Sequence, residues 1–135
     1  MAAEMTVLWL PYPPSANRYL RHTARGTYRT EEANKYRDSA ELEATLSHSR
    51  KLSGPVALKI TLHPKLTKSG HASKTCIDLD NCMKVAVDAL QGILYENDRQ
   101  IAHIEALKSY PVIGGALAVV ATCYEEAAAI VEGLA

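Results

Sequence analysis

Two aspartates, Asp78 and Asp80, lie two residues apart at the point where a helical pattern begins. Lys84 follows one helical turn later, and Asp98 lies in a turn after the helix. Clustered carboxylates repel one another unless a cation lies between them, and carboxylate oxygens are natural ligands of Mg²⁺. If these three acids meet at one point, they form a divalent-metal site beside a lysine that stabilises phosphate oxyanions.

Simpler roles exist for each of these side chains. An aspartate at the start of a helix often caps it, because the free N–H groups and the dipole favour negative charge there. The other acid is then a surface residue. Lys84 lies four residues from both Asp80 and Asp88, so an exposed salt-bridge ladder worth a few tenths of a kcal/mol per pair also explains them. If Lys84 instead lies at the metal site, Asp88 positions it.

Two other chemistries that use an Asp-x-Asp pair fit less well. An EF-hand counted from Asp78 needs an oxygen ligand, a glycine and a glutamate where the chain has Cys82, Met83 and Ala89, so it fails. In the haloacid-dehalogenase pattern, a strongly apolar strand precedes the Asp-x-Asp pair, and Thr or Val follows the pair after one further residue. Here Cys82 follows and residues 73–76 are polar, so that pattern is weakly supported.

Strand signals occur in four segments. Residues 5–10 are an apolar run stopped by prolines, which predicts a buried strand. Residues 56–63 alternate apolar and polar side chains, which predicts a half-buried strand. Segments 103–111 and 115–124 flank Gly114-Gly115, a pair typical of tight turns, so we expect them to form a β-hairpin.

Two helices are expected between these strands. Thr30 is placed to cap a helix that runs to about His48, with two glutamates in its first turn. Its apolar stripe consists of Ala33, Tyr36 and Ala40. The second helix spans about residues 80–91, and Gly92 suits the position just after it. Its stripe consists of Leu79, Met83, Ala86, Val87 and Leu90.

These elements predict an α/β fold of mixed α+β type, with a small mixed sheet of about four strands and two main helices packed on it. The length of 135 residues indicates one domain over residues 1–135. Its core is expected over about residues 5–124. Residues 125–135 are alanine-rich and acidic, and form either a short terminal helix or a tail.

Two segments outside these elements are rich in basic residues. The first follows the prolines of residues 11–14, which favour an extended or turning path. Its arginine forks suit phosphate oxygens and its tyrosines can stack, although a solvated loop explains them equally well. The residues concerned are Arg18, Arg21, Arg25, Arg29, Tyr12, Tyr19 and Tyr28. The second covers residues 65–75, which are polar and include a glycine, so we expect a mobile loop there. It contains Lys65, Lys68 and Lys74, and a histidine, His71, that we expect to be solvated.

The formal net charge of zero conceals an uneven distribution. Residues 11–77 hold twelve Lys and Arg against five Asp and Glu, a net charge of +7. Residues 78–135 hold three against nine, a net charge of −6. The basic half is suited to holding a polyanion while the acidic half holds a metal.

The composition excludes several other classes of protein. A hydrophobic fraction of 47% argues against disorder, and no apolar run approaches the roughly 20 residues of a membrane span. The N-terminus has an acid and no basic region, so it is not expected to be a signal peptide. Three cysteines without CxxC spacing indicate free thiols in a reducing compartment. We therefore expect a cytoplasmic protein with no membrane partner and no small-molecule cofactor.

The order of these motifs resembles the RusA family of Holliday-junction resolvases, small endonucleases of bacteria and their phages. The resemblance covers roughly residues 5 to 124. Any one motif is weak, but the ordered set is specific. The matching residues are Pro13-Pro14-Ser15-x-Asn17-Arg18-Tyr19-x-Arg21-His22, Asp78-Leu79-Asp80-Asn81, Lys84, Asp88-Ala89-Leu90, and Asp98 with Gln100.

The resemblance implies that Asp78, Asp80 and Asp98 bind Mg²⁺, with Mn²⁺ as a substitute, and that Lys84 assists catalysis. It also implies a homodimer that cuts both strands of a four-way DNA junction symmetrically, in recombination and repair. The expected DNA contacts are Asn17, Arg18, Arg21, Lys65, Lys68 and Lys74. One departure is that family members can carry a dense arginine run before the acidic motif, where this chain has diluted lysines. The metal chemistry is therefore implied more firmly than the preference for junctions.

Two other functions remain open at this stage. Another metal-dependent phosphotransferase or phosphatase would also use the Asp-x-Asp pair, and would act on free nucleotides but not on branched DNA. A non-catalytic DNA-binding relative would bind DNA without cleaving it in Mg²⁺ or in Mn²⁺.

Overall fold

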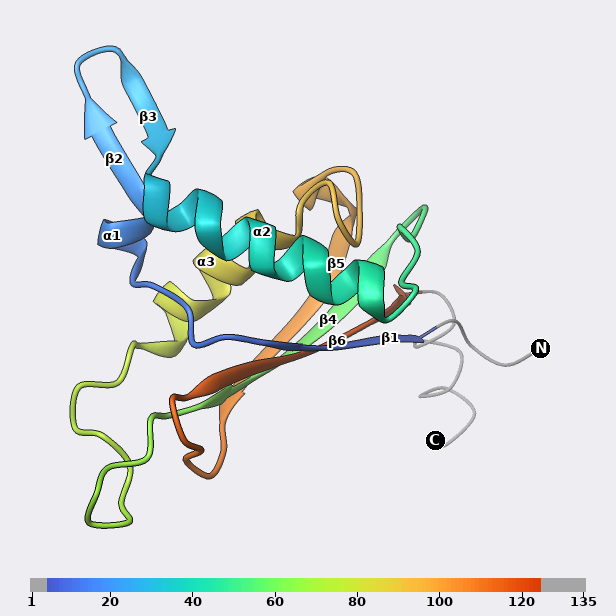
Figure 1. The fold of residues 1–135 in the computed structure, drawn as a ribbon. Coiled ribbons are helices and arrows are strands. Elements are labelled where there is room, and N and C mark those ends of the chain that lie inside the picture. The colour runs from blue at the N-terminus through green and yellow to red at the C-terminus, as the bar shows by residue number, and fades with distance from the viewer. Residues whose placement is uncertain (1–4, 125–135) are drawn as a thin grey trace.

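The computed structural model describes residues 5–124. The terminal helix or tail expected over residues 125–135 lies outside this range. Four strands form the central sheet in the order β1-β6-β4-β5 (Figure 1). They are β1 (Met5–Leu10), β4 (Val56–His63), β5 (Ile101–Lys108) and β6 (Ala116–Cys123). Strand β6 is antiparallel to both of its neighbours, and β4 and β5 are parallel, so the predicted mixed sheet is confirmed.

The hairpin expected between β5 and β6 is wrong, because β4 lies between these two strands. The predicted turn is present: the Gly115 N–H donates to the Val112 carbonyl at 3.0 Å, and Gly114 has a φ of 77°. Before that turn, the chain crosses the end of β4, where the Ser109 N–H bonds the Leu62 carbonyl at 2.9 Å. The chain therefore emerges on the far side of β4. The glycine pair encodes the local reversal but not the strand that β6 pairs with.

Helix α2 (Glu31–Leu46) covers one face of the sheet (Figure 1). It begins at Thr30, whose side chain accepts a hydrogen bond from the Ala33 N–H at 3.1 Å, as predicted. The expected stripe is confirmed, since Ala33, Tyr36 and Ala40 are all buried. The Tyr36 hydroxyl also donates to the Pro11 carbonyl at 2.8 Å, which fastens the helix to the end of β1.

Helix α3 (Leu79–Leu90) packs beside α2 on the same face (Figure 1). It ends as predicted, with Gly92 at a φ of 84° just beyond its last turn. Its buried side is rotated from the expected stripe and consists of Cys82, Val85, Ala86, Ala89 and Leu90. Met83 and Val87 are only partly buried. The small residues in the observed stripe permit close packing, and the rotation leaves larger apolar side chains beside Lys84.

The segment after the prolines is more ordered than the extended or turning path expected of it. A short helix, α1 (Ala16–Tyr19), leads into a two-stranded hairpin of β2 (Leu20–Thr23) and β3 (Gly26–Arg29). This hairpin projects away from the body of the protein as an arm (Figure 1). The sequence did not predict these two strands. Nearly all of their side chains are exposed, so no alternation of apolar and polar residues marks them.

The opposite face of the sheet carries no helix within residues 5–124 (Figure 1). Met5, Val7 and Trp9 of β1 point to this side and are 61%, 54% and 52% exposed. Within the described chain, no helix is both long and apolar enough to cross a bilayer. Cys76 and Cys82 are free thiols, as their spacing predicted.

Candidate active site

Asp78 and Asp80 lie at the beginning of α3. Asp78 occupies the N-cap position, but its side chain makes no capping hydrogen bond, so the simple capping role is not the one observed. Both residues are exposed. Neither side chain makes a hydrogen bond or an ion pair with another residue in the range 5–124. Their oxygens are therefore free to bind a cation.

Asp98 begins the short 3₁₀ helix η1 (Asp98–Gln100). Gln100 holds this turn in place: its side-chain oxygen accepts from the Asn97 N–H at 3.0 Å, and its side-chain amide donates to the Leu52 carbonyl at 2.9 Å. The sequence flagged Gln100 only as a neighbour of the third acid. The structure shows that it ties the Asp98 turn to the body of the protein.

Lys84 and Asp98 line one hollow of about 460 Å³ between α3 and β5. Asp80 lies one helical turn before Lys84 on the same face of α3. The structure thus brings the third acid to the lysine, whereas Asp78 and Asp80 lie outside the hollow lining. Over residues 5–124, no three His, Cys, Asp or Glu side chains are grouped closely enough to hold a metal ion. The convergence of the three carboxylates on one cation therefore stays a prediction.

Asp88 has a different role from either one that the sequence suggested. Its carboxylate accepts two hydrogen bonds from the Arg29 guanidinium, at 2.7 and 3.0 Å, and a further short one from the Tyr19 hydroxyl. Lys84 is not among these partners, so both the salt-bridge ladder and the positioning of Lys84 by Asp88 are wrong. Asp88 instead fastens α1 and the hairpin arm to α3. The sequence could not predict these contacts of Asp88, because the two partners lie 59 and 69 residues away in the chain.

Partial burial opposes the ionisation of Asp88, but the hydrogen bonds from Arg29 and Tyr19 outweigh it and hold its pKa below the ordinary value. We expect Asp88→Asn to lower the free energy of unfolding at pH 7 by about 1–2 kcal/mol. This lies between a solvent-screened ion pair and a buried hydrogen bond to a charged group. Because the folded pKa is depressed, this contribution is present above the unfolded pKa of about 3.9 and is lost as the pH falls through the folded value.

Urea unfolding at pH 7 and at pH 3 measures this difference. The matched control is Asp38→Asn, since Asp38 is an exposed acid on α2, for which we expect a change within about 0.5 kcal/mol. Equal losses for Asp88→Asn at both pH values would contradict the role of ionised Asp88.

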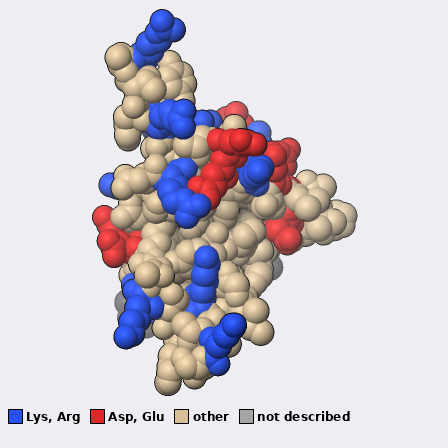
Figure 2. Space-filling model, turned by 60° about the vertical axis from the view of Figure 1, so that its left-hand side comes forward, with Lys and Arg blue, Asp and Glu red and all other residues tan. Residues whose placement is uncertain are grey.

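The predicted DNA contacts are spread over three places. Asn17 and Arg18 lie on α1, Arg21 lies on the hairpin arm, and the three lysines lie on the loop over residues 64–78. All are exposed, as is His71, which confirms its expected solvation. Figure 2 shows basic side chains on the arm at the top of this face, across its middle and at its bottom, with acidic ones beside those in the middle. Whether the lysine loop is mobile stays a prediction.

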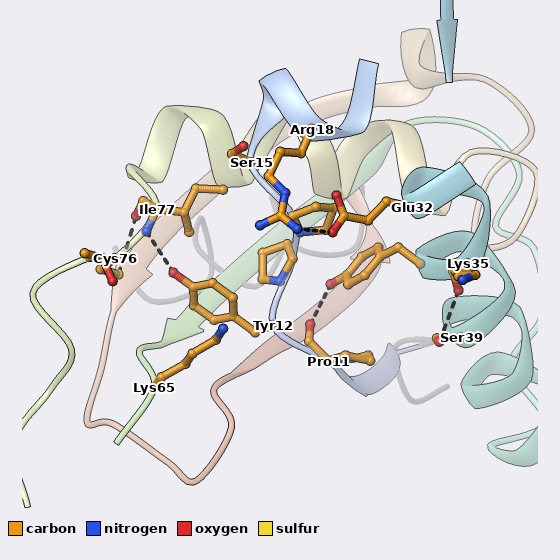
Figure 3. A pocket seen from close by; sticks show the side chains of 14 residues that line it. Pro11, Tyr12, Ser15, Arg18, Glu32, Lys35, Ser39, Lys65, Cys76 and Ile77 are labelled. Atoms are coloured by element: carbon orange, nitrogen blue, oxygen red, sulfur yellow. Dashed lines mark hydrogen bonds and ion pairs between the residues drawn. The ribbon is translucent and has the colours of Figure 1, made fainter. Parts of the chain in front are cut away.

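A groove of about 760 Å³ lies next to the start of α3 (Figure 3). Two of the predicted DNA contacts, Arg18 and Lys65, line it, and so does Tyr12, which belongs to the same tyrosine-containing basic segment. Lys35 also lines it and was not singled out from the sequence. The Tyr12 hydroxyl accepts a hydrogen bond from the Ile77 N–H at 2.8 Å. The wall of the groove is thereby tied to the residue that precedes Asp78.

The site suits one class of reaction, the hydrolysis of phosphodiesters. It has free carboxylates at the start of a helix, a lysine one turn later, and basic side chains on both sides. Carboxylates bind divalent cations and cationic side chains bind phosphates, so the arrangement is that of a metal-dependent phosphodiesterase. The comparison with known proteins narrows this class. Residues 11–119 match the family model described as Endodeoxyribonuclease RusA. The chain belongs to the RusA family.

Curated relatives support the same assignment. The crossover junction endodeoxyribonuclease RusA of Escherichia coli strain K12 is 33% identical over 110 residues, which cover 80% of this chain and 86% of the relative. Proteins of the same name from Shigella sonnei strain Ss046 and Enterobacteria phage 82 are 32% identical over 110 residues. The resemblance inferred from the motifs is therefore confirmed.

Proposed function

We propose that this protein is a Holliday-junction resolvase, which hydrolyses DNA phosphodiester bonds by paired, symmetric nicks at a four-way junction. Its membership of an endodeoxyribonuclease family supports the reaction class. The observation that carries the proposal is the line of free carboxylates and Lys84 along α3, flanked by the basic arm and groove. The relatives come from enteric bacteria and a phage, so we place the reaction in the bacterial cytoplasm, during recombination and repair.

The proposed cofactor is Mg²⁺, for which Mn²⁺ can substitute. Asp78, Asp80 and Asp98 would hold it, because hard carboxylate oxygens suit this cation and these three are exposed and unpaired in the described chain. When bound, the cation supplies charge neutralisation at the scissile phosphate, activation of the attacking water and stabilisation of the leaving 3′-oxygen.

The chain itself has three tasks in this reaction. Lys84 lines the same hollow as Asp98, and its ammonium group would stabilise negative charge that develops on the phosphate. Asn17, Arg18, Arg21, Lys65, Lys68 and Lys74 hold the DNA backbone. Their phosphate contacts position the junction without reading its sequence.

Cleavage of a synthetic four-way junction tests the proposal. The purified protein is incubated with the junction, with its linear duplex arms and with free nucleotides, each with and without Mg²⁺. We expect paired nicks in the junction only when Mg²⁺ is present, and little cutting of the arms. Hydrolysis confined to free nucleotides would indicate a phosphatase, and binding without cleavage in Mg²⁺ and in Mn²⁺ would indicate a non-catalytic relative.

A homodimer is part of the proposal. A four-way junction presents two phosphates related by a two-fold axis, and each needs its own active site. Two subunits related by a two-fold axis supply matching sites. Strand β6 is enclosed in the sheet between β1 and β4, so its edges are already paired. The exposed side chains of β1, among them Trp9, remain available for burial.

We expect the protein to sediment as a dimer at micromolar concentration. When wild-type subunits are mixed with Asp80→Asn subunits, the heterodimers should nick one strand of a junction and fail to complete resolution. Gel analysis of a supercoiled cruciform plasmid distinguishes the outcomes, because one nick gives open circles and two give linear product. A monomer that cuts both strands in one binding event would contradict the paired-site mechanism.

A further inference from the structure

The groove next to the start of α3 contains more cationic side chains than its own packing requires. Three of its lining residues are basic, Arg18, Lys35 and Lys65, and one is acidic, Glu32, which leaves a net charge of +2. The bases come from three separate segments, α1, α2 and the loop after β4. In Figure 3 they lie around the same opening. Cations gathered from distant segments indicate an anionic ligand.

The size of the groove restricts the ligand. A space of about 760 Å³ is too small to enclose a DNA duplex, whose major groove alone is ~12 Å wide. A whole duplex cannot enter it, whereas the sugar-phosphate backbone of one strand can.

The environment of Tyr12 indicates that the groove holds backbone and not a stacked base. The Lys65 ammonium lies 5.0 Å from the centre of the Tyr12 ring. On Gly115, an added Cβ would lie 2.6 Å from the ring carbon Cδ2, so that backbone is already packed against the ring. The hydroxyl is used by Ile77. With these neighbours in place, the ring serves as a wall and not as a stacking platform.

Glu32 determines how Arg18 takes part. The Glu32 carboxylate accepts a hydrogen bond from the Arg18 guanidinium at 2.6 Å (Figure 3). A phosphate that entered the groove would present the same kind of acceptor to the same fork. Lys35 is held only loosely, by Glu31 one turn earlier at 3.8 Å, with both side chains largely exposed.

We infer that this groove binds the phosphodiester backbone of one DNA strand that passes beside Asp78, that Lys35 and Lys65 contact its phosphates, and that a phosphate displaces Glu32 from Arg18. The inference rests on the proposed function and adds the path of one strand to it. The hydrogen bond from Ile77 to Tyr12 connects this path to the acid-bearing end of α3, so a strand held here arrives at the carboxylates.

A cysteine in the groove wall provides a direct test. Cys76 is half-buried and lines the groove, whereas Cys123 pairs with Val56 at the far end of the sheet. The alkylation rate of each thiol by iodoacetamide is followed by mass spectrometry in EDTA, which prevents cleavage. We expect saturating four-way junction to slow alkylation of Cys76 by at least about fivefold and to leave Cys123 unchanged. Equal rates at Cys76 with and without bound junction would overturn the strand path.

Charge substitutions give an independent measurement. The slope of log binding constant against log salt changes by about 0.7–0.9 for each phosphate contact. We expect Lys35→Gln to make the slope shallower by this amount. Glu32→Gln should make junction binding tighter, because Arg18 is freed. The matched controls are Lys108→Gln and Glu41→Gln, exposed residues outside the groove lining, for which the slope should stay within error. Groove variants that behave like these controls would overturn the inference.

The two proposals fail in distinguishable ways. If wild-type protein cuts junctions but bound junction does not protect Cys76, the proposed function stands and the strand path through the groove is overturned. Protection of Cys76 by a mononucleotide or inorganic phosphate as strong as that by the junction would make the groove a small-anion site, which also overturns the strand path. A protein that neither binds nor cuts the junction overturns both.

Discussion

Asp80→Asn abolishes cleavage of four-way junctions while the fold and DNA binding survive: this is the largest effect that we expect of any single substitution. Asparagine preserves the shape of the side chain and removes the charge that a hard cation requires. Asp78→Asn and Asp98→Asn should behave in the same way, each with a loss of at least about 10²-fold in rate, the size expected when one electrostatic contact to a reacting group is removed. Junction binding in EDTA should be equal or tighter, since one negative charge is lost near the phosphates.

Three measurements define this result. Single-turnover cleavage gives the rate, filter binding without metal gives the affinity, and calorimetric titration with Mg²⁺ shows whether cation binding is weakened. Asp38→Asn removes an exposed acid on α2 and serves as the control, with no expected change in any of the three. Near wild-type cleavage by any one of the site variants would remove that aspartate from the proposed ligand set.

The second large effect is expected at Lys84. Lys84→Ala should lower the single-turnover rate by about 10²–10³-fold and change junction affinity by less than about threefold, because its proposed contact forms mainly in the transition state. Its exposed side chain shares a hollow with Asp98, and no ion pair to another residue in the range 5–124 occupies it. Lys84→Arg should recover only part of the rate, because a planar fork is not equivalent to a compact ammonium.

Lys108→Ala removes an exposed lysine at the end of β5 and should leave both rate and affinity unchanged. If rate and affinity fall together in Lys84→Ala, the residue is an ordinary phosphate contact. If neither changes, Lys84 is a surface residue with no part in the reaction.

The sequence by itself determined the elements whose signals are local. Alternation along β4, the Thr30 cap of α2 and the Gly92 end of α3 were each predicted and observed, because each depends on residues a few positions apart. The family could also be predicted from the sequence, because its motifs keep their order and spacing along the chain. The grouping of Lys84 with Asp98 was predictable in part, because the motif named both residues without giving their arrangement.

Contacts between distant residues were decided only by the tertiary structure. The insertion of β4 between β5 and β6 depends on where the chain crosses the sheet, which no turn signal encodes. The attachment of Asp88 to Arg29 and Tyr19 joins residues 59 and 69 positions apart. The groove needs three segments to meet around Tyr12. Charge pairs and grooves arise from packing, and packing follows from the whole core, so local spacing cannot specify which partner each side chain finds.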